Sequence, residues 1–212
     1  MYVEAHNITV DGPHGPLLRR TSVSFRDGRA SLVVGLPGTG HTALALALAG
    51  RLKPSSGHVT IDGEHSLRAL RRRVAAVDVA GVSEPDDVIP FGTVIGEELA
   101  MCGRSGSPSA VRAYLAEHGA EDVAGTRVED IPPDIRMWLL ADLAMRRAGV
   151  EGIVIACPDR YGLAAAVAWE IALWAAEQGT AVLLQLMQNT AESIAVEPTV
   201  IGDGSPEEEG TS

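Results

Sequence analysis

The sequence has little positive charge and almost no cysteine. Its 212 residues include 17 lysines and arginines against 28 aspartates and glutamates, which gives a net charge of −11. A field of this sign repels nucleic-acid phosphates and anionic lipid surfaces, so we expect no nucleic-acid partner. The two cysteines, Cys102 and Cys157, are far apart and lack the spacing of zinc ligands. Neither a disulfide framework nor a zinc site is therefore indicated.

The sequence also lacks a hydrophobic run long enough for a membrane-spanning helix. The longest apolar stretch, LAAAVAWEIALWAA from Leu163, is too short to cross a bilayer and contains Glu170. The first ten residues have no basic segment followed by an apolar core, which is the pattern of a secretory signal. These features predict a cytoplasmic protein without a direct membrane span. A hydrophobic content of 46% at this length predicts one well-buried domain, with room for an inserted lobe.

The periodicity along the chain predicts an α/β fold. Alternating segments on either side of a Gly/Pro turn are predicted as strands at residues 2–10 and 21–25. Near-continuous apolar runs are typical of strands buried on both faces of a parallel sheet, and they occur at 30–35, 74–79, 152–157 and 180–187. A further short strand is predicted at 58–63, and helices at 42–52, 66–73, 135–149 and 162–179. This order predicts a mostly parallel core sheet preceded by antiparallel strands.

Two segments depart from this pattern. Between Gly81 and Pro133 the apolar periodicity weakens, and Gly, Pro, Ser and Asp become frequent. We expect a small helical lobe here, at about residues 92–145, with one helix at 109–119. The chain ends in GDGSPEEEGTS, which predicts an acidic disordered tail at residues 201–212 after a domain at residues 1–200.

A glycine-rich loop, GLPGTGHT, follows the strand at 30–35. It matches the phosphate-loop pattern at every fixed position except the lysine, which is replaced by His41. The predicted binding residues are Gly35, Pro37, Gly38, Thr39, Gly40, His41 and Thr42. Glycines allow backbone N–H groups to form an anion site, the following helix adds its positive end, and the Thr42 hydroxyl is the candidate magnesium ligand.

The role of His41 is open at this point. An imidazole has an ordinary pKa near ~6.5, and a neighbouring polyphosphate favours its charged form, but the side chain is shorter than lysine. The alternative is that the glycines merely form a tight turn between a strand and a helix, with no ligand.

With these motifs the chain resembles the ATP-binding cassette (ABC) ATPases that drive membrane transporters. The segment LAGRLKPSSGHVTIDG after the loop is similar to the family's run of helix, proline, glycine, strand and glycine. FGTVIGEEL, residues 91–99, resembles the segment that opens the family's helical subdomain, and the later elements follow the family's order. The resemblance covers about residues 1–200. It implies a P-loop NTPase fold of ABC type, with ATP and Mg²⁺ as cofactors.

The resemblance fails at the positions that carry the family's chemistry. The adenine-stacking aromatic is replaced in the turn that contains His14, and the glutamine that senses magnesium falls at about Val79. The signature loop aligns with residues 131–135, Ile-Pro-Pro-Asp-Ile, where prolines also remove backbone donors. The switch histidine falls at about Met187, whose polar neighbours are Gln185 and Gln188.

The strand at 152–157 shows the largest loss. In the family this strand ends with an aspartate that supports magnesium and a glutamate that polarises water, and these positions are Ala156 and Cys157. Pro158 is retained, and Asp159 is one or two residues out of place. Losing one preorganised catalytic group typically costs about 10² to 10⁴ in rate, and several such losses leave only background hydrolysis.

We therefore interpret the chain as a catalytically degenerate ABC-type subunit that retains the fold, binds ATP at the loop and hydrolyses little or none. The resemblance implies two partners, an integral membrane permease and a second cassette in a homo- or heterodimer. Through the permease, the chain would lie peripherally at the inner face of the cell membrane.

Three alternatives stay open. A divergent active transport ATPase would need Asp159, Asp78 or Glu84 near the γ-phosphate. A small-molecule kinase would also need the missing lysine and strand-end aspartate. A nucleotide-free structural domain would act through its surfaces alone.

Other conspicuous residues have simpler interpretations. The basic run at 68–73 is typical of a solvated helix face. Trp169 and Trp174 are expected to pack in the core or an interface, and Trp138 near a partner surface. Ion pairs around the lost magnesium site are a hypothesis for Arg146, Arg147 and Arg160, with simple exposure as the alternative.

Overall fold

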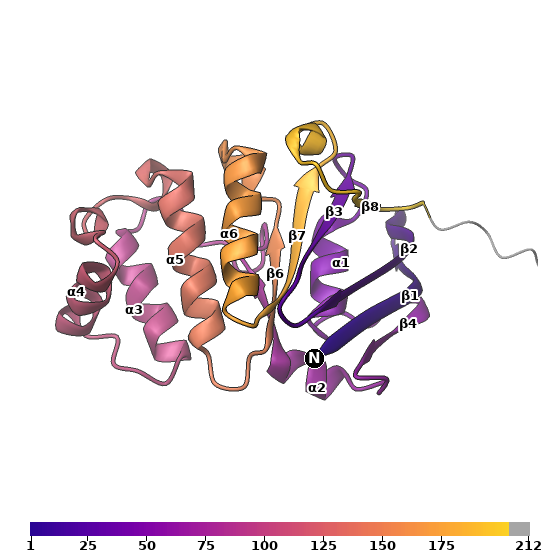
Figure 1. Ribbon diagram of the computed structural model, residues 1–212, viewed down its shortest axis with the longest axis horizontal. Coiled ribbons are helices and arrows are strands. Elements are labelled where there is room, and N and C mark those ends of the chain that lie inside the picture. The colour runs from indigo at the N-terminus through magenta and orange to yellow at the C-terminus, as the bar shows by residue number, and fades with distance from the viewer. Residues whose placement is uncertain (204–212) are drawn as a thin grey trace, which may run out of the picture.

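The computed structural model describes residues 1–203. A five-stranded parallel sheet forms its centre, and a separate three-stranded antiparallel sheet packs beside it (Figure 1). The parallel strands, in spatial order, are β5 (Val74–Val77), β6 (Gly152–Ala156), β7 (Ala181–Met187), β3 (Ala30–Gly35) and β8 (Thr199–Val200). The apolar runs in the sequence form β3, β5, β6 and β7 because both faces of this sheet are covered. The expected α/β fold, with its parallel core sheet, is confirmed.

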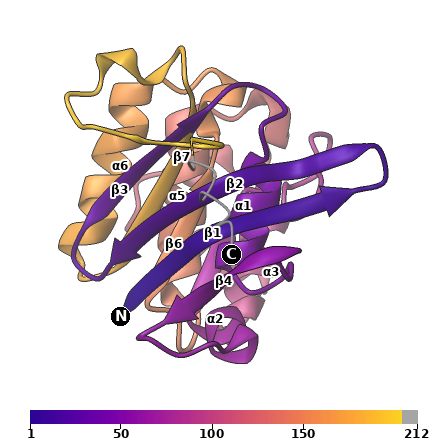
Figure 2. The same cartoon turned by 90° about the vertical axis from the view of Figure 1, so that its right-hand side faces the viewer.

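The antiparallel sheet has the order β2–β1–β4. Its strands are β1 (Tyr2–Gly12), β2 (Gly15–Arg26) and β4 (Ser56–Ile61). Strand β2 begins six residues before the predicted start, because only Pro13 and His14 separate it from β1 and Gly12 pairs with Gly15. Figure 2 shows this sheet on the side of the molecule that carries the N-terminus.

Two hydrophobic clusters lie on the two faces of the parallel sheet. One joins the antiparallel sheet and the helix α1 (His41–Leu48) to residues such as Val33, Val154 and Leu183. The other packs α5 (Pro133–Arg146) and α6 (Ala165–Glu177) on the opposite face. The short helix α2 (Leu67–Arg73) leads directly into β5.

The segment between β5 and β6 is mostly helical. It contains α3 (Phe91–Met101), α4 (Pro108–Glu117) and α5, which lie side by side at one end of the molecule (Figure 1). Short 3-10 helices at Glu121–Val123 and Val128–Asp130 connect α4 to α5. We call α3, α4 and α5, with these connections, the helical segment. Its side chains are continuous with the core on the α5 face of the sheet.

The last described residues stay attached to the sheet. Ile201 is buried, and its N–H donates to the carbonyl of Val34, while the N–H of Gly202 donates to Thr21. The predicted start of the tail at residue 201 therefore falls within an ordered segment, and the rest of the predicted tail, residues 204–212, lies outside the described residues. Within residues 1–203, no helix combines the length and apolar character needed to cross a membrane.

Candidate nucleotide site

The glycine loop connects the end of β3 to the start of α1. Within it, the N–H and the hydroxyl of Thr39 both donate to the carbonyl of Leu36, at 3.1 and 2.8 Å. Gly38 has a φ of 80° and Gly40 a φ of 117°, both in the region that favours glycine. The glycines therefore give the chain the reversal that a strand-to-helix turn needs.

Backbone donors at this turn remain available. The N–H groups of Gly38, Gly40 and His41 form no hydrogen bond with any of residues 1–203. These groups lie at the N-terminal end of α1, where the helix dipole is positive and the first N–H groups have no intrahelical acceptor. Unpaired N–H groups at such a position form a ready site for a phosphate.

Gly40 also fixes the loop against the neighbouring sheet. A Cβ atom at this position would lie 2.5 Å from the carbonyl oxygen of Leu17 and 2.8 Å from the side chain of Leu18. Contacts this short require the backbone of β2 to move. Any larger residue at position 40 therefore disturbs the fold as well as the loop.

His41 does not point its ring into solvent. The side chain is 8% exposed, and its Nε2 lies 3.2 Å from the carbonyl oxygen of Leu186 on β7. Burial lowers the pKa of His41 below 6.5, although the Leu186 carbonyl and the charge of Asp159 act in the opposite direction. In the free protein His41 is therefore mainly neutral at pH 7 and supplies no fixed positive charge to the loop.

The candidate magnesium ligand, Thr42, is partly exposed in the first turn of α1. Its hydroxyl forms no hydrogen bond within the described part of the chain. Across residues 1–203, the His, Cys, Asp and Glu side chains form no group of three able to hold a metal ion. An oxygen ligand is thus present at the loop, without a cluster of carboxylates around it.

The end of β6 carries no acidic side chain. Ala156 is the last residue of the strand, and Cys157 follows with a φ of 48° and only 4% exposure. Burial and the nearby charge of Asp159 raise the pKa of the Cys157 thiol to about 12. At neutral pH this thiol is protonated, so it cannot act as a base towards water.

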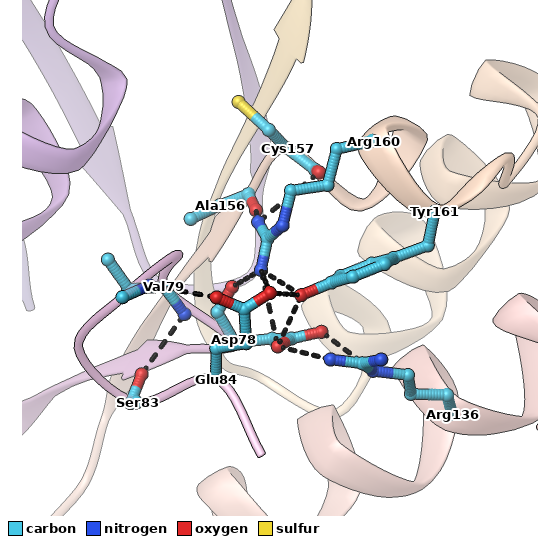
Figure 3. A network of polar contacts seen from close by, with 10 residues as sticks. Asp78, Val79, Ser83, Glu84, Arg136, Ala156, Cys157, Arg160 and Tyr161 are labelled. Carbon is cyan, nitrogen blue, oxygen red and sulfur yellow. Dashed lines mark hydrogen bonds and ion pairs between the residues drawn. The ribbon is translucent and has the colours of Figure 1, made fainter. Parts of the chain in front are cut away.

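Arg160 occupies the space beside these two strand ends (Figure 3). It lies in the 3-10 helix Pro158–Tyr161, and one of its Nη atoms donates to the carbonyl of Ala156 and, at 3.4 Å, to that of Cys157. The other Nη donates to the backbone carbonyl of Asp78 at 2.5 Å and approaches its carboxylate at 3.3 Å. A guanidinium therefore caps the carboxyl ends of both β5 and β6.

Asp78 is the centre of the same network. Its carboxylate has 0% exposure and accepts two hydrogen bonds from Arg136 of α5, at 2.9 and 3.1 Å. Burial raises the pKa of Asp78, while Arg136 and Arg160 act to lower it. The pair joins the end of β5 to the first turns of α5, so it fixes the helical segment to the parallel sheet.

Tyr161 and Glu84 close the network on its outer side. The Tyr161 hydroxyl donates to the Glu84 carboxylate, and the Arg136 guanidinium lies 3.8 Å from the centre of the Tyr161 ring (Figure 3). The hydrogen bond from Tyr161, and a second from the Gly81 N–H, lower the pKa of Glu84. Glu84 is therefore an ionised partner of the network at neutral pH.

Asp159 is engaged on the other side of β6. One of its carboxylate oxygens accepts hydrogen bonds from the Met187 N–H at 2.8 Å and from the Thr190 hydroxyl at 2.5 Å. Its second oxygen is buried without a partner among the described residues. Asp159 thus joins Met187, the last residue of β7 and the position expected for a switch histidine, to Thr190 in the turn that follows.

The structure brings most of the predicted site residues to one edge of the parallel sheet. The loop, Ala156, Cys157 and Asp159 all lie where the strands β3, β6 and β7 end. His14 is exposed in the turn between β1 and β2, and residues 131–135 begin α5. The turn comes shortly before Leu17, which Gly40 approaches, and residues 131–135 directly precede Arg136, the partner of Asp78.

Of the three arginines considered for this edge, only Arg160 reaches it. Arg146 pairs with Asp142 and Glu117, and Arg147 pairs with Glu98, so both act within the helical segment. The three tryptophans are partly buried against the core, and Trp138 meets Trp174 edge-on at 5.9 Å. Trp169 and Trp174 thus pack against the core and stay partly exposed, which is compatible with both the core and the interface interpretation.

Three residues of this region were not identified in the sequence: Arg136, Tyr161 and Gln185. Gln185 appeared only as a polar neighbour of Met187, yet it is fully buried in β7. The signal for it was an amide inside an otherwise apolar strand. Arg136 and Tyr161 carried no comparable signal, because their partner Asp78 lies far away in the sequence.

Comparisons with known proteins agree with this geometry. A model of the ABC transporter family matches residues 18–136. The hemin import ATP-binding protein HmuV of Burkholderia cenocepacia is 29% identical over 158 residues, which are 71% of this chain and 50% of HmuV. The taurine import ATP-binding protein TauB of Pseudomonas savastanoi pv. phaseolicola is 27% identical over 188 residues, 86% of this chain and 66% of TauB. The chain thus spans about half to two thirds of the length of these relatives.

Solved structures show the same fold. An ATP-binding subunit of an ABC transporter superposes with a TM-score of 0.64 at 16% identity, covering 95% of this chain and 86% of that one. A nucleotide-free ATP-binding cassette from an ABC transporter gives 0.62 at 17% identity, covering 90% and 84%. The family match extends over more than half of the chain, so this protein belongs to the ABC transporter ATP-binding family.

Proposed function

We propose that this protein is an ATP-binding cassette subunit of a transporter that binds ATP at the glycine loop but hydrolyses little or none of it. The observation that carries the proposal is a contrast between the ends of β3 and β6, the two strands that flank β7 in the parallel sheet. The loop after β3 keeps unpaired N–H donors. The end of β6 carries Ala156 and Cys157, and the Arg160 guanidinium is bound to their carbonyls.

Arg160 supports the loss of hydrolysis through its charge as well as its position. A cation held by the carbonyls of β6 and by Asp78 repels a divalent metal ion at the same place. Thr42 remains the residue that would hold Mg²⁺, which would supply charge neutralisation to the phosphates when bound. The side-chain oxygen fits this role, and residues 1–203 offer no group of three His, Cys, Asp or Glu side chains for a metal ion, so we expect Mg²⁺ to bind together with the nucleotide rather than to the free protein.

The available acidic residues do not restore a catalytic base. Asp78 is fully buried against Arg136 and Arg160, and Glu84 accepts from Tyr161. Asp159 is held by the Met187 N–H and the Thr190 hydroxyl. The divergent active ATPase would have to release one of these carboxylates first, which makes it the weaker proposal.

A calorimetric titration with ATP and Mg²⁺ tests the binding half of the proposal. Gly38 suits a blocking variant, because a Cβ there meets open space and its φ of 80° is one that Asp and Asn tolerate. We expect wild-type binding in the micromolar range, no binding for Gly38→Asp, and retained though weaker binding for the uncharged control Gly38→Asn. Equal affinities for Gly38→Asp and the wild type would contradict binding at the loop.

A groove supports the proposed permease partner. It lies between the parallel sheet and the helical segment, has a volume of about 540 Å³, and is lined partly by Val82, Ile89 and Met101. Val82 and Met101 are 55% and 54% exposed, and Glu84, Asp86, Glu97 and Glu98 outnumber Arg51 and Arg147 in the lining. Such a surface fits a helical permease segment with an apolar face and basic flanks.

Co-purification from membranes tests this partner. We expect Met101→Asp to abolish recovery of a membrane protein with the tagged chain. A matched control, Leu173→Asp, changes an apolar residue of α6 that is 41% exposed outside the groove, and it should leave recovery intact. Equal recovery with both variants would exclude the groove. Sedimentation of the same samples with and without ATP and Mg²⁺ would show whether the second cassette is another copy of this chain or a different protein.

A further inference from the structure

Gln185 is an unusual residue for the centre of a parallel sheet. It lies in β7 with 0% exposure, and neither its side-chain Oε1 nor its Nε2 has a hydrogen-bond partner within residues 1–203. Burying an unpaired amide is unfavourable, whereas an apolar residue of the same size would be well tolerated there. A buried polar group of this kind requires an explanation other than packing.

The register of the sheet defines where this amide lies. Gln185 is paired with Val33 of β3 on one side and with Ala156 of β6 on the other. Residues in register on parallel strands point to the same face of the sheet. Val33 and Ala156 belong to the hydrophobic cluster that contains Ala43 and Leu44 of α1. The Gln185 side chain is therefore on the α1 face of the sheet.

Its height in the sheet is equally informative. Val33 lies two residues before Gly35, where the glycine loop begins, and Ala156 is the last residue of β6. Measured along the strands, Gln185 thus lies two residues before the level of Gly35, where the loop begins, and on the face covered by α1. The first turn of α1 carries Thr42, whose hydroxyl is also without a partner in the described part of the chain.

We propose that Gln185 is a positioning residue for magnesium at the nucleotide site. Its Oε1 would accept a hydrogen bond from a water molecule of hydrated Mg²⁺ held by Thr42 and the nucleotide phosphates. This inference rests on the proposed binding of ATP at the loop. Mg²⁺ usually retains several of its water molecules in protein sites. An amide oxygen can accept a hydrogen bond from such a water and so orient it. A neutral amide also needs no counter-charge when buried, unlike an aspartate.

The test compares ATP affinity in the presence of Mg²⁺ with ATP affinity in EDTA. The variant is Gln185→Met, which preserves the length of the side chain but removes both polar atoms. Leu183→Met serves as the matched control, because Leu183 lies on the same face of β7, is equally buried and is one layer farther from the loop. Gln185→Leu provides a second variant if Gln185→Met does not fold. Urea unfolding of each free protein is measured in parallel.

We expect magnesium to strengthen ATP binding about tenfold in the wild type and in Leu183→Met. In Gln185→Met this strengthening should fall to about twofold or less, while the affinity in EDTA stays unchanged. The urea midpoint of the free variant should be equal to or higher than that of the wild type, because an unpaired buried amide has been removed.

Two results would overturn the inference. One is a Gln185→Met protein in which magnesium still strengthens ATP binding as in the wild type. The other is an equal loss of affinity with and without magnesium, since that would indicate damage to the loop. If the wild type binds no ATP in either condition, the proposed function itself fails, and this inference fails with it.

Discussion

Removing the Asp78 carboxylate tests how the helical segment is attached to the parallel sheet. Asp78 follows β5 directly and has 0% side-chain exposure, and its partner Arg136 on α5 is 3% exposed. Replacing Asp78 with Ala leaves the Arg136 guanidinium buried, with the Tyr161 ring at 3.8 Å but without the carboxylate that accepts its two hydrogen bonds. Removing one partner of a buried pair typically costs about 3–5 kcal/mol. We expect the free energy of unfolding of Asp78→Ala to fall by about 3 kcal/mol or more.

Urea unfolding at pH 7, followed by circular dichroism, measures this loss from the transition midpoint and slope. The double variant Asp78→Asn with Arg136→Met removes both charges of the pair and keeps a residue that tolerates the φ of 51° at position 78, so it should recover part of the stability. Arg73→Met is a surface control, because Arg73 pairs with the exposed Asp62 and Glu151, and it should cost about 1 kcal/mol or less. A loss below about 1 kcal/mol for Asp78→Ala would refute the structural role given to the pair.

Three further predictions concern the loop and the end of β6. Gly40→Ala should lower the free energy of unfolding in urea by at least about 2 kcal/mol, because its Cβ would lie 2.5 Å from the Leu17 carbonyl oxygen. The control Gly38→Ala meets open space and should lower it by about 1 kcal/mol. Equal losses for the two variants would contradict the close approach at Gly40. Because burial lowers the pKa of His41 below 6.5, the unfolded chain takes up a proton first on acidification. The stability that neutral His41 contributes should therefore be complete above pH 6.5 and decline below it. Urea unfolding at pH 7.5 and 5.5 tests this: the wild type should lose more of its free energy of unfolding between the two pH values than His41→Gln does. The Cys157 thiol should resist a thiol reagent at pH 8 until urea unfolds the protein, because it is 4% exposed and its pKa is raised to about 12. Rapid labelling of Cys157 in the native protein, identified by peptide mapping, would argue against its burial.

The elements of the core could be predicted because their signals are local. Four apolar runs became β3, β5, β6 and β7, and the glycine loop formed the turn before α1. These features depend on side-chain periodicity and on glycine conformations within a few residues. The beginning of β2 was predicted too late, because its first residues pair through a tight hairpin that the alternation of polar and apolar residues does not reveal.

The network beside the loop could not be predicted, because it depends on contacts between distant segments. Asp78 and Arg136 are 58 positions apart, and Asp78 and Arg160 are 82 apart. The position of Arg160 was weighed as an ion pair against simple exposure, and only the packing of the 3-10 helix against β5 and β6 decides between them. The burial of His41 could not be predicted for the same reason, because its ring lies against the carbonyl of Leu186 in β7, 145 positions away in the sequence.

A ³¹P NMR experiment tests most directly whether the protein binds ATP without hydrolysing it. ATP and Mg²⁺ are mixed with an equimolar amount of the protein, and spectra are recorded for several hours. We predict that the three ATP resonances shift or broaden relative to free ATP and that no inorganic phosphate accumulates above the protein-free control. Resonances identical to those of free ATP would contradict binding. Phosphate released at a rate on the order of 1 s⁻¹, and lost in Thr42→Ala, would contradict the absence of hydrolysis.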